Sequence, residues 1–127
     1  MEYMLVSLIL LLLIILLFTG SIKYRLNANE IKLYATYWFP YTIKLQDIDN
    51  IKILDQVNFG IRLCGLGSFR CAAGLFRNKA YGNYILYTDD YSGQHIEIRL
   101  KSGKTVVFGI RKQSILNLYN ELQRRIK

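Results

Sequence analysis

The stretch HIEIRLKSGKTVVFGI, residues 95–110, decides the fold of this chain. Apolar and polar residues alternate strictly from His95 to Lys101. Because successive side chains of a β-strand point to opposite faces, this alternation predicts a strand with one buried and one solvated face. Residues 101–104, Lys-Ser-Gly-Lys, then predict a hairpin loop into a second strand at residues 105–110. The stretch therefore predicts an antiparallel hairpin.

Similar alternation fills the chain upstream of this hairpin. Residues 22–26 predict a first strand, and residues 27–30, Asn-Ala-Asn-Glu, predict a turn. The next strand begins at Ile31, and short alternating runs follow as far as Ile53. Runs of period two that are joined by turn residues are typical of an antiparallel meander with one wet face. We expect about seven strands in all.

The hydrophobic period changes from two to about 3.6 at the C-terminal end. The apolar residues there recur three and four positions apart, as on one face of a helix: Ile115, Leu118, Tyr119, Leu122 and Ile126. Basic residues crowd the last turn, where the helix dipole favours cations. The chain is therefore predicted to be α+β, with this helix covering the open end of a strongly bent sheet.

The N-terminal end carries a long apolar segment without a charged residue, from Tyr3 to Ile22. Apart from Ser7, residues 5–18 are all Leu, Ile, Val or Phe. A helix of about twenty residues is about 30 Å long, which matches the hydrocarbon core of a bilayer. We therefore predict a transmembrane helix over residues 1–22. The remainder, residues 23–127, has the length of one small domain.

A cleaved signal peptide is the alternative interpretation of this segment. Such peptides begin with a positive region, which residues 1–3 lack, although residues 19–21, Thr-Gly-Ser, could serve as a cleavage site. Lys23 and Arg25 follow the segment, and no basic residue precedes it. The positive-inside rule then predicts a single-pass protein of the cell membrane with a cytoplasmic C-terminal domain.

The chain is strongly basic, with 17 Lys and Arg against 9 Asp and Glu and a net charge of +8. Such a charge favours an acidic partner, namely nucleic acid, anionic lipid or an acidic protein. Anionic lipid ranks first among these, because a chain that sits in a membrane always meets the headgroup surface. Nucleic acid ranks low, because Phe69 and Phe76, the aromatics near the basic residues, fit a core equally well.

Three segments carry a family resemblance through their order along the chain. The first runs from Tyr24 to Ile51, the second is glycine-spaced and runs from Arg62 to Phe76, and the third joins residues 106–110 to the final helix. In this order they resemble the bacterial pleckstrin-homology-like (PH-like) domains that occur beside transmembrane segments. The resemblance implies a bent sheet or barrel of seven strands, capped by the last helix, and a role in binding or assembly.

Phosphoinositide recognition does not carry over from this resemblance. PH domains that hold phosphoinositides place basic residues around the loop between their first two strands. Here that loop is residues 27–30, and it contains no Lys or Arg.

The sequence shows no motif for catalysis, a cofactor or a metal. Residues 65–70 begin like a dinucleotide fingerprint, but arginine replaces the third glycine, so we expect the glycines to bend a strand or form bulges. Cys64, Cys71 and the single His95 lack zinc-site spacing. We expect buried reduced thiols, or a disulfide if the domain is exported. We also expect His95 at the surface and a hairpin loop at residues 89–90, Asp-Asp.

One candidate for a functional surface is basic, because no acid occurs between Gly60 and Lys79. We name it the basic group: Arg62, Arg70, Arg77 and Lys79. It is a candidate for binding an anionic lipid or a partner protein, and a solvated positive face is the alternative.

The second candidate is aromatic, and we name it the aromatic tip: Tyr37, Trp38 and Phe39. Six residues of strand carry the chain about 20 Å away from the membrane, and an antiparallel return brings this tip back. Trp and Tyr are favoured at the membrane interface, so we expect the tip to contact headgroups. A buried Trp38 is the alternative.

These observations favour a binding module over an enzyme. The leading hypothesis is a membrane-anchored PH-like module that recognises a partner protein or anionic lipid at the cytoplasmic membrane face. The alternative is a structural or regulatory subunit of a membrane complex, which assembles through its transmembrane helix.

Overall fold

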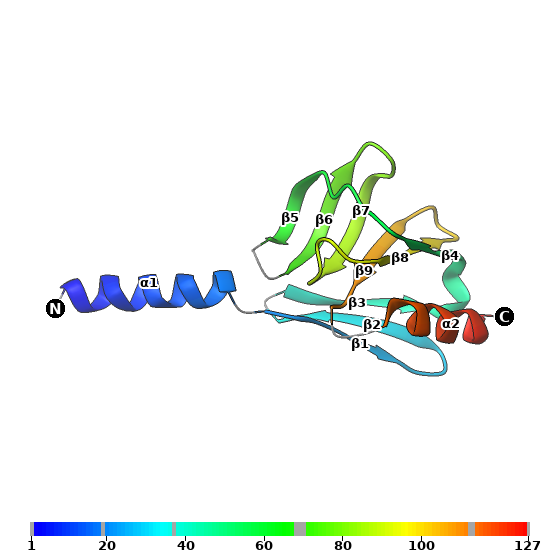
Figure 1. The fold of residues 1–127 in the computed structure, drawn as a ribbon, viewed down its shortest axis with the longest axis horizontal. Helices are drawn as coiled ribbons and strands as arrows, with labels where there is room; N and C mark the ends of the chain where they lie inside the picture. Colours follow the sequence, from blue (N-terminus) through cyan, green and yellow to red (C-terminus); the bar gives the residue numbers. More distant parts are fainter. Residues whose placement is uncertain (1, 19, 37, 68–70, 112–113, 127) are drawn as a thin grey trace.

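The computed structural model describes residues 2–18, 20–36, 38–67, 71–111 and 114–126, without the side chains of residues 16–18 and 66. Helix α1 (Glu2–Phe18) projects from a domain of strands that carries one further helix (Figure 1). The elements of the domain are β1 (Ile22–Leu26), β2 (Glu30–Ala35), β3 (Trp38–Lys44), the 3-10 helix η1 (Leu45–Asp47), β4 (Ile48–Leu54), β5 (Ile61–Gly67), β6 (Ala72–Asn78), β7 (Gly82–Thr88), β8 (His95–Leu100), β9 (Thr105–Gly109) and α2 (Ile115–Ile126). The fold is α+β, as predicted.

The strands form two sheets. One has three strands in the order β1-β2-β3, and the other has six in the order β4-β8-β9-β7-β6-β5. Strands β7 and β9 run parallel, whereas the other pairs are antiparallel. The described residues thus form nine strands rather than about seven. The meander prediction also fails here, because the β8–β9 hairpin inserts between β4 and β7 instead of pairing with the strand before it.

Two predicted turns are confirmed. Between β8 and β9, the Leu100 N–H donates to the Lys104 carbonyl at 2.9 Å, which closes the hairpin. Between β1 and β2, the Asn27 side chain accepts hydrogen bonds from the N–H groups of Asn29 and Glu30, both at 2.9 Å. Asn is favoured in turns because its side chain can satisfy the backbone in this way.

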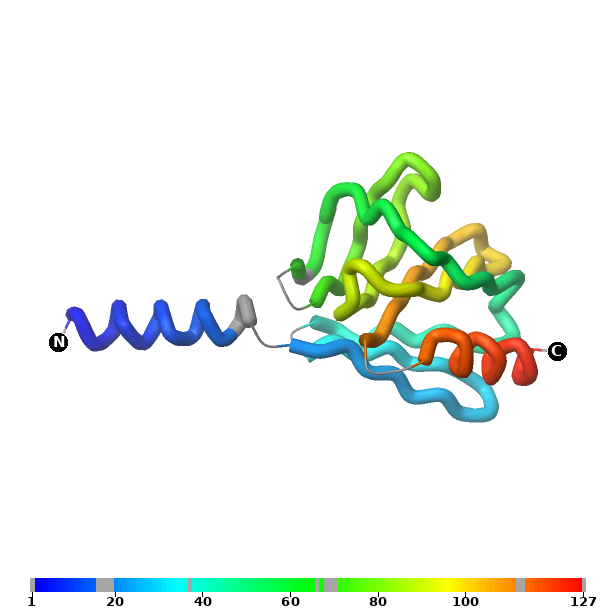
Figure 2. The backbone as a smooth tube through the Cα atoms, viewed as in Figure 1, coloured from blue at the N-terminus to red at the C-terminus, as the bar shows by residue number. Residues whose placement is uncertain are grey.

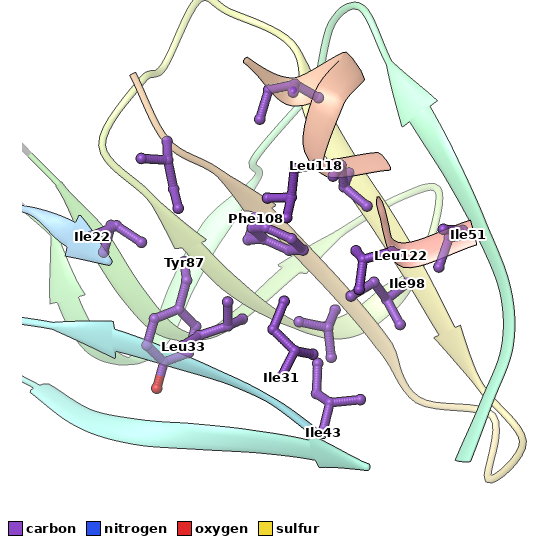
Figure 3. Close-up of a cluster of buried hydrophobic side chains, with 14 of the residues drawn as sticks. Ile22, Ile31, Leu33, Ile43, Ile51, Tyr87, Ile98, Phe108, Leu118 and Leu122 are labelled. Atoms are coloured by element: carbon purple, nitrogen blue, oxygen red, sulfur yellow. The ribbon is translucent and has the colours of Figure 1, made fainter. Parts of the chain in front are cut away.

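The main core lies between the two sheets and is closed by α2 (Figure 3). Phe108 of β9 lies between side chains of the three-stranded sheet, such as Ile31, and side chains of α2, such as Leu118. The predicted apolar stripe of the C-terminal helix is confirmed: Ile115, Leu118 and Leu122 are buried, and Tyr119 and Ile126 pack against the core. Helix α2 lies against β4, β8 and η1.

A second, smaller core covers the outer face of the six-stranded sheet. Strands β4 and β5 follow each other in sequence but form opposite edges of that sheet, so residues 55–60 cross its face as a strap (Figure 2). Val57 and Phe59 of the strap pack on a buried cluster: Ala72, Phe76, Tyr84, Leu86 and Val107. The Tyr84 hydroxyl donates to the Phe59 carbonyl at 2.7 Å and ties the strap to β7.

The N-terminal helix differs from the predicted membrane span. Within the described part of the chain, no helix combines the length and the apolarity needed to cross a membrane. Helix α1 has 17 residues and ends at Phe18, so it is about 26 Å long instead of about 30 Å. Ile22, the last residue of the predicted span, is the first residue of β1.

Candidate functional site

The junction between α1 and the domain is fixed by hydrogen bonds. The Ser21 N–H donates to Thr36 Oγ1 at 3.0 Å, and the Thr36 N–H donates to the Ser21 carbonyl at 3.2 Å. The Ile22 N–H donates to Asp89 Oδ2 at 3.3 Å. The end of β2 and the end of β7 therefore both hold the segment through which the chain leaves α1. We call this region the α1 end of the domain.

Trp38 and Phe39 of the aromatic tip lie at the α1 end. Trp38 is in register with Ala35, next to the residue that pairs with Ser21, so the chain does return to the point where it left α1. Phe39 is 72% exposed, whereas Trp38 is half-buried and packs against the core. Their rings meet edge to face, with centroids 5.2 Å apart. Tyr37, the third predicted member, lies outside the described residues.

The described members of the basic group lie at the other end of the β5–β6 hairpin. Arg62 is the second residue of β5, Arg77 is near the end of β6, and Lys79 is in the following turn. Strand β6 begins beside Thr88, at the α1 end, and its seven residues extend about 20 Å from there to Asn78. Three members of the group thus lie far from α1. Arg70 lies outside the described residues.

These three cations do not form one pocket. Arg62 is in register with Phe76, and Ile61 with Arg77, so Arg62 and Arg77 belong to opposite faces of the sheet. Arg77 and Lys79 line an open hollow of about 630 Å³ together with polar residues and the exposed Ile61. The Arg62 guanidinium instead donates to the Gly67 carbonyl at 3.4 Å.

Gly65 and Gly74 allow a close approach of β5 and β6, whereas the bulge of β5 lies before Gly65 and not at the glycines that were predicted to form it. Gly65 and Gly74 face each other with φ of +130° and +135°, which favour glycine. A Cβ atom on Gly74 would lie 2.4 Å from the Cys64 carbonyl oxygen, so the two backbones approach more closely than side chains would allow. A register shift between Arg62 and Cys64 adds a bulge at this edge.

His95 is buried, so the prediction of a surface position is wrong. Its Nδ1 lies 2.9 Å from the Gly93 carbonyl oxygen, its Nε2 lies 2.8 Å from Thr88 Oγ1, and the Phe59 ring of the strap covers it. A carbonyl only accepts, so Nδ1 carries a proton and donates it to Gly93. Burial lowers the pKa of His95 below its usual 6.5, although Asp90 and Asp89 oppose this. The imidazole is therefore a neutral structural group.

Asp89 and Asp90 lie between β7 and β8, which are not neighbours in the sheet, so they do not form the predicted hairpin loop. The Asp90 side chain does form a turn, because it accepts hydrogen bonds from the N–H groups of Ser92 and Gly93. Asp89 instead bridges distant segments, since it also accepts a hydrogen bond from the Arg111 N–H at 2.7 Å. No local pattern predicts this role.

The remaining polar groups of interest are structural. Cys64 is exposed and Cys71 is buried, and neither forms a disulfide, so the prediction of buried reduced thiols holds for Cys71. Glu97 is buried on β8 and pairs with Lys52 at 3.2 Å and with Arg99 at 3.6 Å. Within the described residues, no group of His, Cys, Asp and Glu could hold a metal ion.

The domain thus consists of two packed sheets closed by a C-terminal helix. The family model for the bacterial PH domain matches residues 22–125, and the chain belongs to this family. Domains of this family type are generally non-catalytic binding modules. Neither a curated protein nor a solved structure gives a significant match. The match begins at β1, so α1 lies outside the family domain.

Proposed function

We propose that the chain is a membrane-anchored PH-like module that recognises a partner protein or an anionic lipid at the cytoplasmic membrane face. The observation that carries this proposal is the direct attachment of the apolar helix α1 to a bacterial PH domain. Only Thr19, Gly20 and Ser21 separate the last residue of α1 from β1.

The surface of α1 supports insertion into a lipid phase. Every large apolar side chain from Tyr3 to Ile15 is between 40% and 85% exposed. A continuous apolar surface of this kind is rare on proteins that stay in water and marks an interaction with a membrane or a partner. Lys23 and Arg25 follow α1 on β1, which favours a cytoplasmic position for the domain.

The placement of the basic group favours a protein over a headgroup as its ligand. Arg77 and Lys79 lie about 20 Å from the α1 end, at the far end of β6. The field of an anionic leaflet falls off within about 8 Å at physiological salt. Headgroup contact therefore suits the aromatic tip, and an acidic protein surface suits the basic group.

Extraction of cell membranes with alkaline carbonate tests the anchor. The full chain should stay in the membrane pellet, and a variant without residues 2–18 should be released. Release of the full chain would overturn the anchored function. A reporter fused after Lys127 should show the domain on the cytoplasmic side, and an external reporter would overturn that location.

Crosslinking in intact cells tests the binding role and separates it from assembly through α1. A partner that is lost in the charge-reversal variant R62E/R77E/K79E, but kept when α1 is replaced by an unrelated poly-Leu helix, supports the module. The control variant K101E/K104E changes exposed lysines of the β8–β9 turn and should keep the partner. The opposite pattern would identify a subunit that assembles through α1.

A further inference from the structure

Strand β5 is an open sheet edge. It pairs only with β6, and among the described elements it has no other extensive contact (Figure 1). Of the other edge strands, β4 is packed against α2, whereas β1 and β3 are each held at one residue: Asp89 accepts the N–H of Ile22 on β1, and the Tyr87 hydroxyl donates to the Phe39 carbonyl of β3. The free side of an edge strand presents backbone N–H and C=O groups that can pair with another strand.

The side chains on this edge are unusually apolar for a surface. Outside α1, four large apolar side chains are exposed among the described residues, and two of them are on β5: Phe39, Ile61, Leu63 and Leu116. Ile61 is 62% exposed and Leu63 is 44% exposed, and the thiol-bearing Cys64 follows them at the surface. An incoming strand could cover these side chains while it pairs with the backbone.

The charge around the edge defines what such a strand must carry. Arg62, Arg77 and Lys79 surround the first half of β5, and the sequence has no acid from Gly60 to Lys79. The hollow beside Ile61 is lined by Arg77 and Lys79 and is open to an acidic side chain. A second copy of this chain would bring the same cations face to face, which disfavours self-pairing.

We propose that β5 binds an extended, acidic segment of a partner protein as an additional strand of the six-stranded sheet. Alternate side chains of that segment point to opposite faces, so its apolar residues cover Ile61 on the face that carries Arg77, and its Asp or Glu side chains meet Arg62 on the other face. Arg77 and Lys79 add positive charge beside Ile61, which favours a segment that is acidic overall. This inference rests on the proposed function and specifies its partner. The mode of binding is strand addition, in which the backbone supplies affinity and alternate side chains supply specificity.

The bulge between Arg62 and Cys64 limits how long the pairing is. Bulges are one device by which proteins protect an edge from indiscriminate pairing. Regular pairing with β6 resumes at Cys64 and continues to Gly67. The added strand therefore pairs over a short stretch, and the contacts to Ile61, Leu63 and the cations must select the segment.

Binding of a synthetic peptide to the full chain in nanodiscs of neutral phosphatidylcholine tests the proposal. The probe is a nonapeptide in which Val alternates with Glu. One control peptide replaces Glu by Lys, and another carries N-methyl groups on alternate amides, which blocks strand pairing but keeps the side chains. We expect amide NMR shifts centred on β5 with the probe, and binding weaker by about tenfold or more with either control peptide.

Protein variants locate the binding site. I61K and R62E/R77E/K79E should each weaken probe binding by about tenfold, whereas L116K, which changes an exposed apolar residue on α2, should not alter it. Absence of β5 shifts at millimolar probe, or equal binding of the N-methylated peptide, would overturn strand addition. So would self-association that I61K abolishes, because a second copy would then occupy the edge.

The two proposals fail separately. If the probe does not bind β5, but carbonate leaves the chain in the membrane and a crosslinked partner depends on the basic group, the anchored module stands and strand addition is wrong. If α1 does not hold the chain in the membrane but the probe still binds β5, the anchor is wrong and the edge site stands.

Discussion

The carboxylate of Asp89 accepts a hydrogen bond from the backbone N–H of Ile22, a residue 67 positions earlier in the chain. Its other oxygen accepts the Arg111 N–H at 2.7 Å. One side chain at the end of β7 thus joins the first residue of β1 to the segment that follows β9. Asp89 thereby fixes the point at which α1 leaves the domain.

Replacement of Asp89 by Ala should lower the free energy of unfolding by about 2 kcal/mol, because two backbone N–H groups lose a charged acceptor. Asp89→Asn should cost less, because the amide keeps one acceptor oxygen. Asp49 is exposed on β4, and Asp49→Ala should stay within about 0.5 kcal/mol of the wild type. Thermal unfolding of the full chain in mild detergent measures these differences. Equal stability of the Asp89 and Asp49 variants would contradict the bridging role.

Replacement of Gly74 by Ala should destabilise the domain by about 2 kcal/mol or more. The new Cβ would lie 2.4 Å from the Cys64 carbonyl oxygen, at a φ of +135° that L-residues avoid. Gly103→Ala is the matched control, because its φ is also positive but nothing lies within 4 Å of the added Cβ. Its cost should be about 1 kcal/mol, from backbone strain alone. The same unfolding measurement applies, and a Gly74 variant as stable as the Gly103 variant would rule out the close approach.

The free energy of unfolding should fall as the pH drops below about 6.5, because His95 binds a proton more readily in the unfolded chain than in the folded domain. Burial lowers the pKa of His95 in the folded domain, so between that lowered value and 6.5 the unfolded chain binds a proton that the folded chain does not. In this window the free energy of unfolding rises with pH, by at most about 1.4 kcal/mol per pH unit.

The variant His95→Gln isolates this contribution, because glutamine does not titrate. Unfolding of wild type and variant between pH 5.5 and pH 7.5 should show a smaller pH slope for the variant. Identical slopes would mean that His95 is protonated equally in both states, and the buried neutral imidazole would be wrong.

Trp38 should be quenched by lipids that carry bromine near the headgroup when the full chain is reconstituted. Trp38 is the single tryptophan, and it lies beside the exposed Phe39 at the α1 end. Phe39→Asp should reduce the quenching, because a carboxylate disfavours contact with the interface. Unquenched fluorescence from a chain that resists carbonate extraction would show that the aromatic tip does not touch the membrane.

The sequence predicted those parts of the fold that depend only on the spacing of apolar residues within a short segment. The β8–β9 hairpin follows from alternation and a turn, and α2 follows from apolar spacing of three and four residues. The parallel pairing of β7 with β9 could not be predicted, because a period of two does not say which strands become neighbours. The number of strands was also underestimated, at about seven against nine among the described residues.

The strand that begins at His95 was predicted correctly, but the solvent exposure of its polar face was not. Alternation along β8 places His95 and Glu97 on the polar face, and polar faces are normally solvated. Here Phe59 of the strap covers that face at His95, and Glu97 is buried beside Lys52, Arg99 and Tyr81. The covering segment lies about 40 residues earlier in the sequence, and no local pattern reveals it.

The functional role of the basic group stays a prediction, and the structure shows only where its described members lie. The sequence singled out Arg62, Arg77 and Lys79, and the structure places all three at one end of the β5–β6 hairpin. It did not reveal that β5 is a free edge, because an edge is a property of the strand order of the whole sheet. Arg70 and Tyr37 remain predictions, because they lie outside the described residues.

The insertion of the β8–β9 hairpin between β4 and β7 also dictates the order of events during synthesis. Strands β5, β6 and β7 can pair with one another as soon as they leave the ribosome, because their contacts are local. Strand β4 must wait for β8, whose first residue is His95, and β7 must wait for β9. The nascent domain therefore carries two unpaired strand edges until residue 109 has emerged, and a chain truncated before that point should aggregate.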